Sequence, residues 1–202
     1  MTSKVAIVNR ALTKLGATRI VALTDNTKEA REMAATFDIV RDSELRKNRW
    51  SFSIKRAQLA SDVTTPLFEY SHRFLLPADY LRGLMVGQYW PGLDMTDYRT
   101  GPGGQDWLIE SGYILFNGDG PLNLRYIARA EDTALWDASF VEAFACKLAV
   151  ETCEAITQSS EKRQLAKQEY DEAIFAAKRA GAIELPPQQI ADDTWVISRL
   201  RS

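Results

Sequence analysis

Apolar residues recur at helical spacing near both ends of this 202-residue chain, but not in between. The first segment of this kind has apolar residues three or four positions apart, at Val5, Val8, Leu12 and Leu15. This spacing predicts a helix over residues 3–15 that Gly16 would end. A chain with helices at both ends and none in the middle can fold as a helical domain that carries an insertion.

A second helical segment follows a stretch rich in capping residues. Asn26 and Glu29 have the spacing of a capping box and predict a helix that extends to Asn48. Its buried stripe is expected to consist of Ala30, Met33, Phe37 and Val40. Its charged outer face is expected to carry Arg31, Glu32, Asp38, Arg41 and Asp42.

Past Trp50, proline, glycine and aromatic residues become dense, and helical periodicity disappears until about Asp137. This pattern predicts β structure. The run FEYSHRFLL alternates loosely and predicts a strand. The runs YILF and LNLRYIA flank the turn-forming NGDG and together predict a β-hairpin. Residues 89–106 are rich in turn residues and predict an exposed loop or a hairpin tip.

Helical spacing returns at Asp137, where Ser139 and Glu142 could form a capping box. An apolar ridge consists of Phe140, Phe144 and Leu148. After a break at residues 158–160, Ser160 is expected to cap a fourth helix, which Gly181 would end. Its apolar positions are Leu165, Tyr170, Ile174 and Ala177. The short turn between the two helices predicts that they are antiparallel.

The pattern as a whole predicts an α+β fold. Residues 1–50 and 137–181 are expected to form an antiparallel helical bundle, with a β-rich insertion at 51–136 and an extended C-terminal arm at 182–202. The arm contains a Pro-Pro pair at residues 186–187 and lacks a periodicity that could build a core. The core of the bundle is expected to include Val8, Leu12, Phe37, Phe144, Leu148 and Ile174.

Composition favours no particular partner. Twenty-five basic and 27 acidic residues give a net charge of −2, so any attraction to nucleic acid would come from local clustering. No stretch has the pattern of a signal peptide or is apolar for long enough to span a bilayer. We therefore expect a soluble protein that is intracellular when made, with no membrane partner.

Residue types that carry chemistry are few and isolated. His72 is the only histidine, so it is interpreted as an ordinary strand residue rather than as a base or a metal ligand. Cys146 and Cys153 would lie about 10 Å apart on a helix, too far for a disulfide, and are expected in the core. The glycine-rich stretch 101–104 lacks the GK[ST] ending of a phosphate loop. No enzymatic activity, metal or cofactor is expected.

One basic cluster remains, and it consists of Arg41, Arg46, Lys47, Arg49, Lys55 and Arg56. With the neighbouring aromatic residues it could form a DNA-binding surface. Asp42 and Glu44 interrupt it, which favours a solvated helix face over direct DNA binding. A third interpretation is that these charges contact a neighbouring subunit.

Several separated segments occur in an order that resembles the tail tubular protein A family of tailed bacteriophages. They are NRALTKLGATRI, the stretch from TDNTKEA to KRAQL, EYSHRFLLPADYLR, LWDASFVEAFACKLAVETC and DDTWVISR. The most specific parts are the RWSF ending of the second helix, LPADYLR and the terminal DDTW. Members of this family are head-to-tail adaptors, and they also occur in prophages.

The resemblance implies a structural, non-enzymatic protein with a helical bundle and a β-rich insertion. Its copies would form a ring, expected to be dodecameric, that joins the portal protein to the tail tube or nozzle protein. DNA would pass through the ring without sequence-specific binding. The protein would be made in the bacterial host cytoplasm and reside in the virion at the head-to-tail junction.

The resemblance and the residue patterns together assign three contact regions. The portal-binding arm would use Trp195, Val196, Ile197, Arg199 and Leu200. Subunit contacts would involve Arg46, Arg49, Trp50 and Arg56. The tail-facing loop would include Tyr98, Arg99 and Gln105. The alternative is a DNA-binding accessory protein that uses the region from Arg46 to Arg56.

Overall fold

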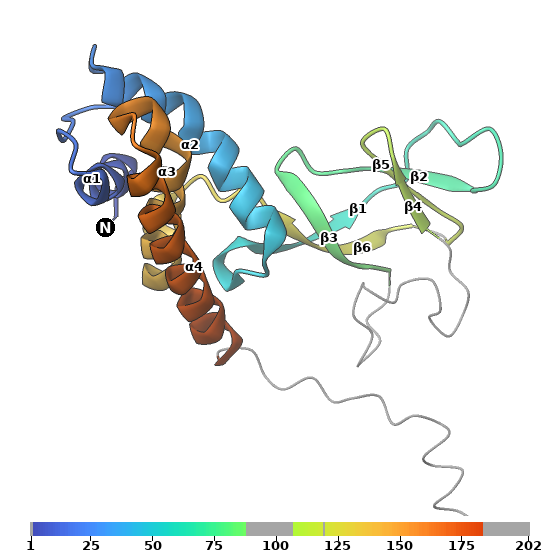
Figure 1. Cartoon of the computed structure of the whole chain (residues 1–202). Helices are drawn as coiled ribbons and strands as arrows, with labels where there is room; N and C mark the ends of the chain where they lie inside the picture. The colour runs from blue at the N-terminus through green and yellow to red at the C-terminus, as the bar shows by residue number, and fades with distance from the viewer. Residues whose placement is uncertain (1, 88–106, 119, 184–202) are drawn as a thin grey trace, which may run out of the picture. The chain divides into compact units, whose positions relative to one another are not determined.

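The computed structural model describes residues 2–87, 107–118 and 120–183, which form four α-helices and six strands (Figure 1). The strands make two antiparallel sheets of three strands each. The chain divides into two compact units. The helical unit contains the described residues up to Ser53 and from Arg129 onward, and the sheet unit contains those from Ile54 to Ala128. The fold is α+β, as the sequence predicts.

The sheet unit, residues 54–128, is shorter than the predicted insertion of residues 51–136. Aromatic residues on both sides of the boundary explain the difference. Trp50, Phe52 and Trp136 pack around Phe140, with ring centroids 4.7, 5.1 and 5.1 Å from its ring. The residues that flank the insertion therefore contribute to the core of the helical unit.

Helix α1 (Lys4–Leu15) ends where the sequence predicts and begins one residue after the predicted start at Ser3. The Ser3 side chain accepts a hydrogen bond from the Ala6 amide and caps the first turn. Gly16 has a φ of 68°, in the left-handed region that glycine adopts without strain, and ends the helix. Both boundaries follow from local residue chemistry.

Helix α2 (Lys28–Lys47) buries the predicted stripe of Ala30, Met33, Phe37 and Val40. Its cap is Thr27, whose hydroxyl accepts from the Ala30 amide, and not Asn26 as the capping-box spacing predicted. The prediction for the outer face is wrong at Arg41, which is only 4% exposed. Acidic neighbours make this burial possible, as described below.

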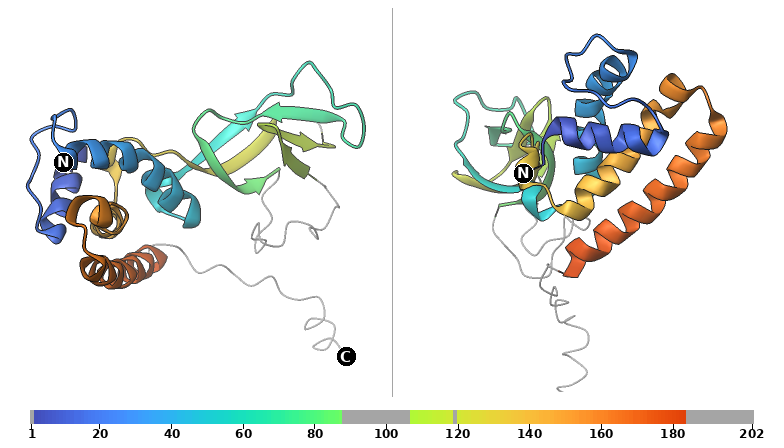
Figure 2. Two further views of the ribbon diagram at one scale, coloured as in Figure 1. Left: turned by 45° about the horizontal axis from the view of Figure 1, so that its top comes forward. Right: turned by 90° about the vertical axis from the view of Figure 1, so that its left-hand side faces the viewer.

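Helices α3 (Ala138–Thr157) and α4 (Ser160–Ile183) are joined by two residues and lie side by side (Figure 2), so they run antiparallel, as predicted. Asp137 caps α3 by accepting from the Ser139 and Phe140 amides, so the predicted cap at Ser139 is wrong. Ser159, rather than Ser160, accepts from the Lys162 amide at the start of α4. Helix α4 also continues past Gly181, where it was expected to end.

The core of the helical unit centres on α3, which contacts each of the other three helices. The predicted core residues Val8, Leu12, Phe37, Phe144 and Leu148 are all buried, whereas Ile174 is only half-buried. Phe37 and Trp136 both pack edge-on against Phe144, each with ring centroids 5.1 Å apart. Edge-to-face pairs add to the stabilisation that burial provides.

The sheet unit contains two short sheets. In the first sheet, β6 (Leu122–Ala128) lies between β1 (Ile54–Leu59) and β3 (Tyr80–Val86). In the second sheet, β5 (Tyr113–Phe116) lies between β2 (His72–Leu75) and β4 (Trp107–Glu110). The strand predicted in FEYSHRFLL is thus present as β2.

The predicted hairpin of YILF and LNLRYIA is wrong, because β5 and β6 belong to different sheets. Both strands instead direct apolar side chains into one core, where Ile114 and Phe116 of β5 meet Leu122 and Leu124 of β6. The turn between them therefore carries the chain from one sheet to the other. The same turn residues can join two strands of a hairpin or connect two sheets. Here the core that the two sheets share favours the second arrangement.

Candidate functional site

Trp50, three residues after the end of helix α2, is a core residue with 4% exposure. Its indole Nε1 donates to the Glu44 carbonyl at 3.4 Å, and its ring centroid lies 4.7 Å from that of Phe140. The Ser53 hydroxyl donates to the Trp50 carbonyl at 2.9 Å. The tryptophan therefore closes the core of the helical unit. Its burial leaves it little surface for the predicted subunit contact, so that role remains a prediction for the arginines alone.

Glu44 is a buried carboxylate, with 1% exposure, that links α2 to α4. One of its oxygens accepts from the Tyr170 hydroxyl at 2.8 Å, and the other accepts from the Lys47 ammonium at 2.7 Å. Burial and the hydrogen bond to Glu44 raise the pKa of the Tyr170 hydroxyl. The sequence carries no local signal for this contact, because Glu44 and Tyr170 lie 126 positions apart.

Arg41 is buried because carboxylates surround its guanidinium. It donates to Asp38 at 2.6 Å and to Asp42 at 2.8 Å. The second oxygen of Asp42 accepts from Arg129 at 2.8 Å. A buried charge held by such partners positions helix α2 and is not available to a ligand.

The three predicted interface arginines are divided between the two units. Arg46 is exposed and Arg49 partly buried, both in the helical unit, while Arg56 is exposed on β1 of the sheet unit. Of the two lysines in the cluster, Lys47 is paired with Glu44, and Lys55 pairs with Asp79 at 2.6 Å. Acidic partners thus hold at least half of the six basic residues.

A second network of charges joins α1 to α3 and α4. Arg10 donates to both oxygens of Glu142 at 3.0 Å, and Lys14 lies 2.9 Å from Glu142 and 3.2 Å from Glu169. The Arg10 hydrogen bonds, with help from Lys14, lower the pKa of Glu142 to about 2. The sequence gives little indication of this network, because it predicts for Glu142 only a place in a capping box.

In the sheet unit, Asp79 accepts hydrogen bonds from Lys55 at 2.6 Å and from the Tyr126 hydroxyl at 2.9 Å. Burial alone would raise the pKa of Asp79, but these two donors lower it. Burial and the bond to Asp79 raise the pKa of Tyr126 to about 12. This arrangement ties β1, β6 and the turn before β3 together.

The two cysteines and the histidine, residue types often used in catalysis, have partners within the fold. Cys146 and Cys153 are free and buried, as predicted. Burial raises the pKa of the Cys146 thiol, which disfavours its reactive thiolate form. His72 pairs with Phe116 in the sheet, and its Nδ1 lies 3.3 Å from the Ser61 hydroxyl.

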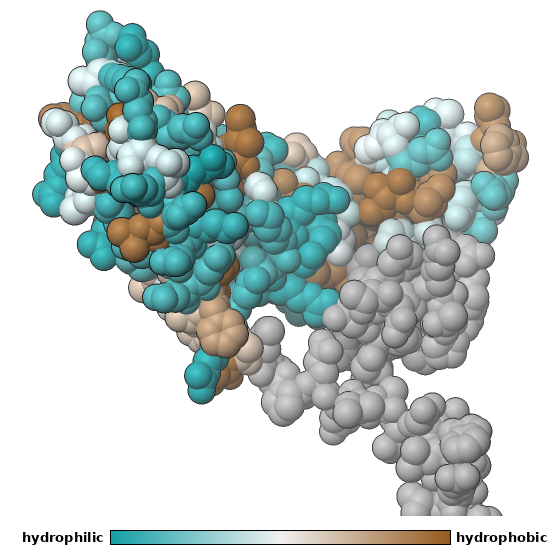
Figure 3. Space-filling model, viewed as in Figure 1, coloured by the Kyte–Doolittle hydropathy of each residue, from teal (hydrophilic) through white to brown (hydrophobic). Residues whose placement is uncertain are grey.

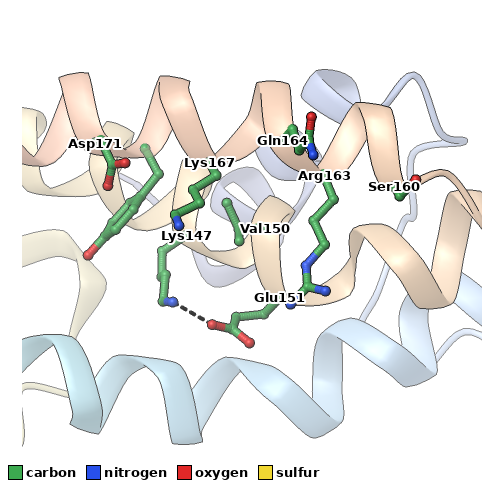
Figure 4. Close-up of a pocket in the computed structure, with 9 residues that line it drawn as sticks. Lys147, Val150, Glu151, Ser160, Arg163, Gln164, Lys167 and Asp171 are labelled. Atoms are coloured by element: carbon green, nitrogen blue, oxygen red, sulfur yellow. Dashed lines mark hydrogen bonds and ion pairs between the residues drawn. The ribbon is translucent and has the colours of Figure 1, made fainter.

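Each of the two units carries a surface groove that described residues line. The first has a volume of about 460 Å³ and lies along α3 and α4 (Figure 4). Charged residues of both signs line it: Lys147, Glu151, Arg163, Lys167 and Asp171. Lys147 pairs with Glu151, and Arg163 pairs with Glu154 at 3.0 Å. This groove is therefore a surface of mixed charge and not an anion site.

The second groove has a volume of about 380 Å³ and belongs to the sheet unit. Residues 64–70 form one wall, and the turn and adjoining strands of the β4–β5 hairpin form the other. Ser111 and Gly112, with φ of 48° and 82°, make the tight turn of that hairpin. Arg73 lies within this groove, which we call the sheet groove.

Two of the predicted contact regions lie outside the described residues. They are the loop residues Tyr98, Arg99 and Gln105, and the arm residues Trp195, Val196, Ile197, Arg199 and Leu200. The glycine-rich stretch 101–104 lies outside them as well.

Within the described ranges, no group of three or more His, Cys, Asp or Glu side chains could hold a metal ion. None of the helices described above is both long and apolar enough to cross a membrane. No model of a known protein family matches the sequence, and no curated protein matches it.

Proposed function

We propose that the protein is a structural head-to-tail adaptor of a tailed bacteriophage or prophage. The observation that carries this proposal is the order of the RWSF, LPADYLR and DDTW segments, which resembles the tail tubular protein A family. The order of elements supports it, because two helices, a β-rich insertion with six strands in its described residues, and two further helices correspond to the architecture that the resemblance implies.

In this proposal the copies form a dodecameric ring between the portal protein and the tail tube or nozzle protein, in the virion. The C-terminal arm with Trp195 binds the portal, and the loop with Tyr98 and Gln105 faces the tail. Arg46, Arg49 and Arg56 contribute to contacts between neighbouring subunits. Such contacts are heterologous and close by rotation into a ring.

The charge distribution agrees with a ring that lets DNA pass. The net charge is −2, and carboxylates hold Arg41, Lys47 and Lys55 of the basic cluster. A protein that binds DNA tightly would present these charges to phosphate groups instead. This pairing is the reason for preferring an adaptor to a DNA-binding protein.

The deciding experiment mixes the purified protein with portal-bearing heads of the same phage. We expect the protein to co-sediment with the heads and to appear as a ring on the portal by electron microscopy. Truncation after Pro187, or Trp195→Ala, should reduce co-sedimentation while leaving the circular dichroism spectrum nearly unchanged. Phe175→Ala, at a 69% exposed position on α4, is the matched control. Full portal binding by the truncated protein would refute the role of the arm.

The tail-facing role has a separate test. Replacing residues 98–105 with a short Gly-Ser linker should spare folding and portal binding but weaken attachment of the tail. Unchanged attachment would show that the loop makes no necessary contact.

The alternative is a DNA-binding accessory protein that uses the region from Arg46 to Arg56. The exposure of Arg46 and Arg56 is the observation in its favour. Binding to duplex DNA, titrated with salt, separates the two functions. A steep loss of affinity with increasing salt would indicate phosphate contacts and favour the alternative.

A further inference from the structure

The sheet groove has polar and apolar residues in its walls, and some of the apolar ones are open to solvent. Leu67 and Phe68, in its wall, are 98% and 77% exposed. Figure 3 shows hydrophobic residues gathered on the sheet unit around the second sheet. Clustered apolar side chains of this kind mark binding surfaces, because water solvates them poorly.

Strand register shows why this apolar surface is uncovered. Arg73, Leu115 and Leu108 lie opposite one another across β2, β5 and β4. Leu75, Tyr113 and Glu110 form the next row on the same face. Successive side chains of a strand point to opposite faces, and the alternate residues Phe74 and Ile114 fill the core. The face that bears Leu75 and Leu108 is therefore directed away from the core.

Charges of both signs border these apolar residues. The Arg73 guanidinium lies 4.5 Å from the centre of the Tyr113 ring and 3.2 Å from Asp62. Glu69 and Glu110 line the same groove. An occupant would therefore fit best with apolar side chains flanked by both acidic and basic residues.

We propose that the sheet groove is the docking site for this chain's own C-terminal segment, residues 192–201, before any partner binds. This segment has the matching composition. Trp195, Val196 and Ile197 follow Asp192 and Asp193. Leu200 lies between Arg199 and Arg201. In the proposed docking, the apolar residues would cover Leu67, Phe68 and Leu115, the acidic pair would face Arg73, and the arginines would face Glu69 and Glu110.

A tether of twelve residues lies between Ile183, the last described residue of α4, and Trp195, and it can span up to about 40 Å when extended. Because the segment is tethered, its local concentration is high and a weak contact is sufficient. The groove along α3 and α4 is a poorer match, since Val150 is the only aliphatic residue that lines it.

This inference concerns the free protein and does not rest on the adaptor proposal. Its first test places a photoreactive phenylalanine analogue at position 195 of the full-length chain. After illumination, cross-links should map to residues 64–73 or 108–115 of the same chain. Cross-links to the helical unit, or the absence of any cross-link, would overturn the proposal. Cross-linked dimers would identify a second copy as the occupant and would also overturn it.

The second test uses hydrogen exchange of the full-length protein without portal. Leu67→Ser with Phe68→Ser should accelerate exchange in residues 192–201 by at least about threefold, because the segment loses its apolar contact. Leu165→Ser with Phe175→Ser, at exposed positions on α4, is the matched control and should leave that exchange unchanged. Equal exchange in all three proteins would refute docking, whether or not the protein binds a portal.

Discussion

The helical unit and the sheet unit differ in where they place their exposed apolar residues. In the helical unit such residues are scattered over the surface, at Val21, Ile39, Leu135, Leu165, Phe175 and Ile183. In the sheet unit they concentrate on one loop and one sheet, at Val63, Leu67, Phe68, Leu75, Leu108 and Ile109. The helical unit instead gathers its aromatic residues in the core, around Phe140 and Phe144. Scattered exposed apolar residues are typical of a scaffold, whereas clustered ones are typical of a binding surface.

The largest effect should come from removing a buried aromatic ring of the helical unit. Phe144→Ala is expected to lower the free energy of unfolding by about 3–5 kcal/mol, because the side chain is 1% exposed and leaves a cavity. Urea unfolding followed by circular dichroism measures this change. Phe175→Ala, at an exposed position, should change it by less than about 0.5 kcal/mol. A near-neutral Phe144→Ala would refute the core described here.

A pair of tyrosines compares buried hydrogen bonds in the two units. Tyr170→Phe leaves the buried carboxylate of Glu44 with one donor fewer and should cost about 1.5–3 kcal/mol. Tyr126→Phe should cost about 1 kcal/mol, because Asp79 is 32% exposed and water can replace the lost donor. Equal costs in denaturant titrations would contradict the greater burial of the site in the helical unit.

Acid should weaken the helical unit through Glu142. Its pKa is about 2 in the folded protein and 4.5 ordinarily, so the unfolded chain binds the proton more tightly. The stabilisation is therefore present above about pH 4.5 and is lost as the pH falls towards 2. We expect a loss of about 1 kcal/mol, because the side chain is 42% exposed and solvent screens the ion pair.

The matching variant is Glu142→Gln, which should flatten the pH dependence of unfolding between pH 4.5 and 2. The control Glu172→Gln, at an exposed position on α4, should leave the dependence as it is. A pH profile of Glu142→Gln identical to that of the wild type would show that the ion pairs with Arg10 and Lys14 contribute no stability.

The smallest effect on stability, but a large one on assembly, is expected from the proposed interface arginines. Arg46→Glu with Arg49→Glu should change the free energy of unfolding by less than about 1 kcal/mol, because Arg46 is exposed and Arg49 only partly buried. Like charges repeated at every contact of a closed ring should impair its formation on the portal. Lys178→Glu with Arg179→Glu, at exposed positions on α4, is the control for electron microscopy. Normal rings from the first variant would exclude these arginines from the interface.

The sequence by itself determined the features that depend on neighbouring residues. The apolar spacing and Gly16 placed the end of α1 correctly and its start within one residue. The two pairs of helices on either side of a β-rich insertion follow from the same local rules, since helix periodicity and turn chemistry act over a few positions. Cap errors of one residue, at Thr27 and Ser159, reflect adjacent residues of nearly equal capping ability.

Only the tertiary structure decided which distant groups meet. It assigned β5 and β6 to different sheets, because their apolar side chains face a common core instead of pairing edge to edge. It also buried Arg41 and Glu44, which a helical pattern places among solvent-exposed charges. Burial of a charge is favourable only when partners compensate its lost hydration. Arg41 has such partners in Asp38 and Asp42 of its own helix, whereas the Tyr170 hydroxyl that donates to Glu44 comes from a remote part of the chain. Local sequence patterns specify the helices and strands, and interactions between distant residues specify how these elements contact one another.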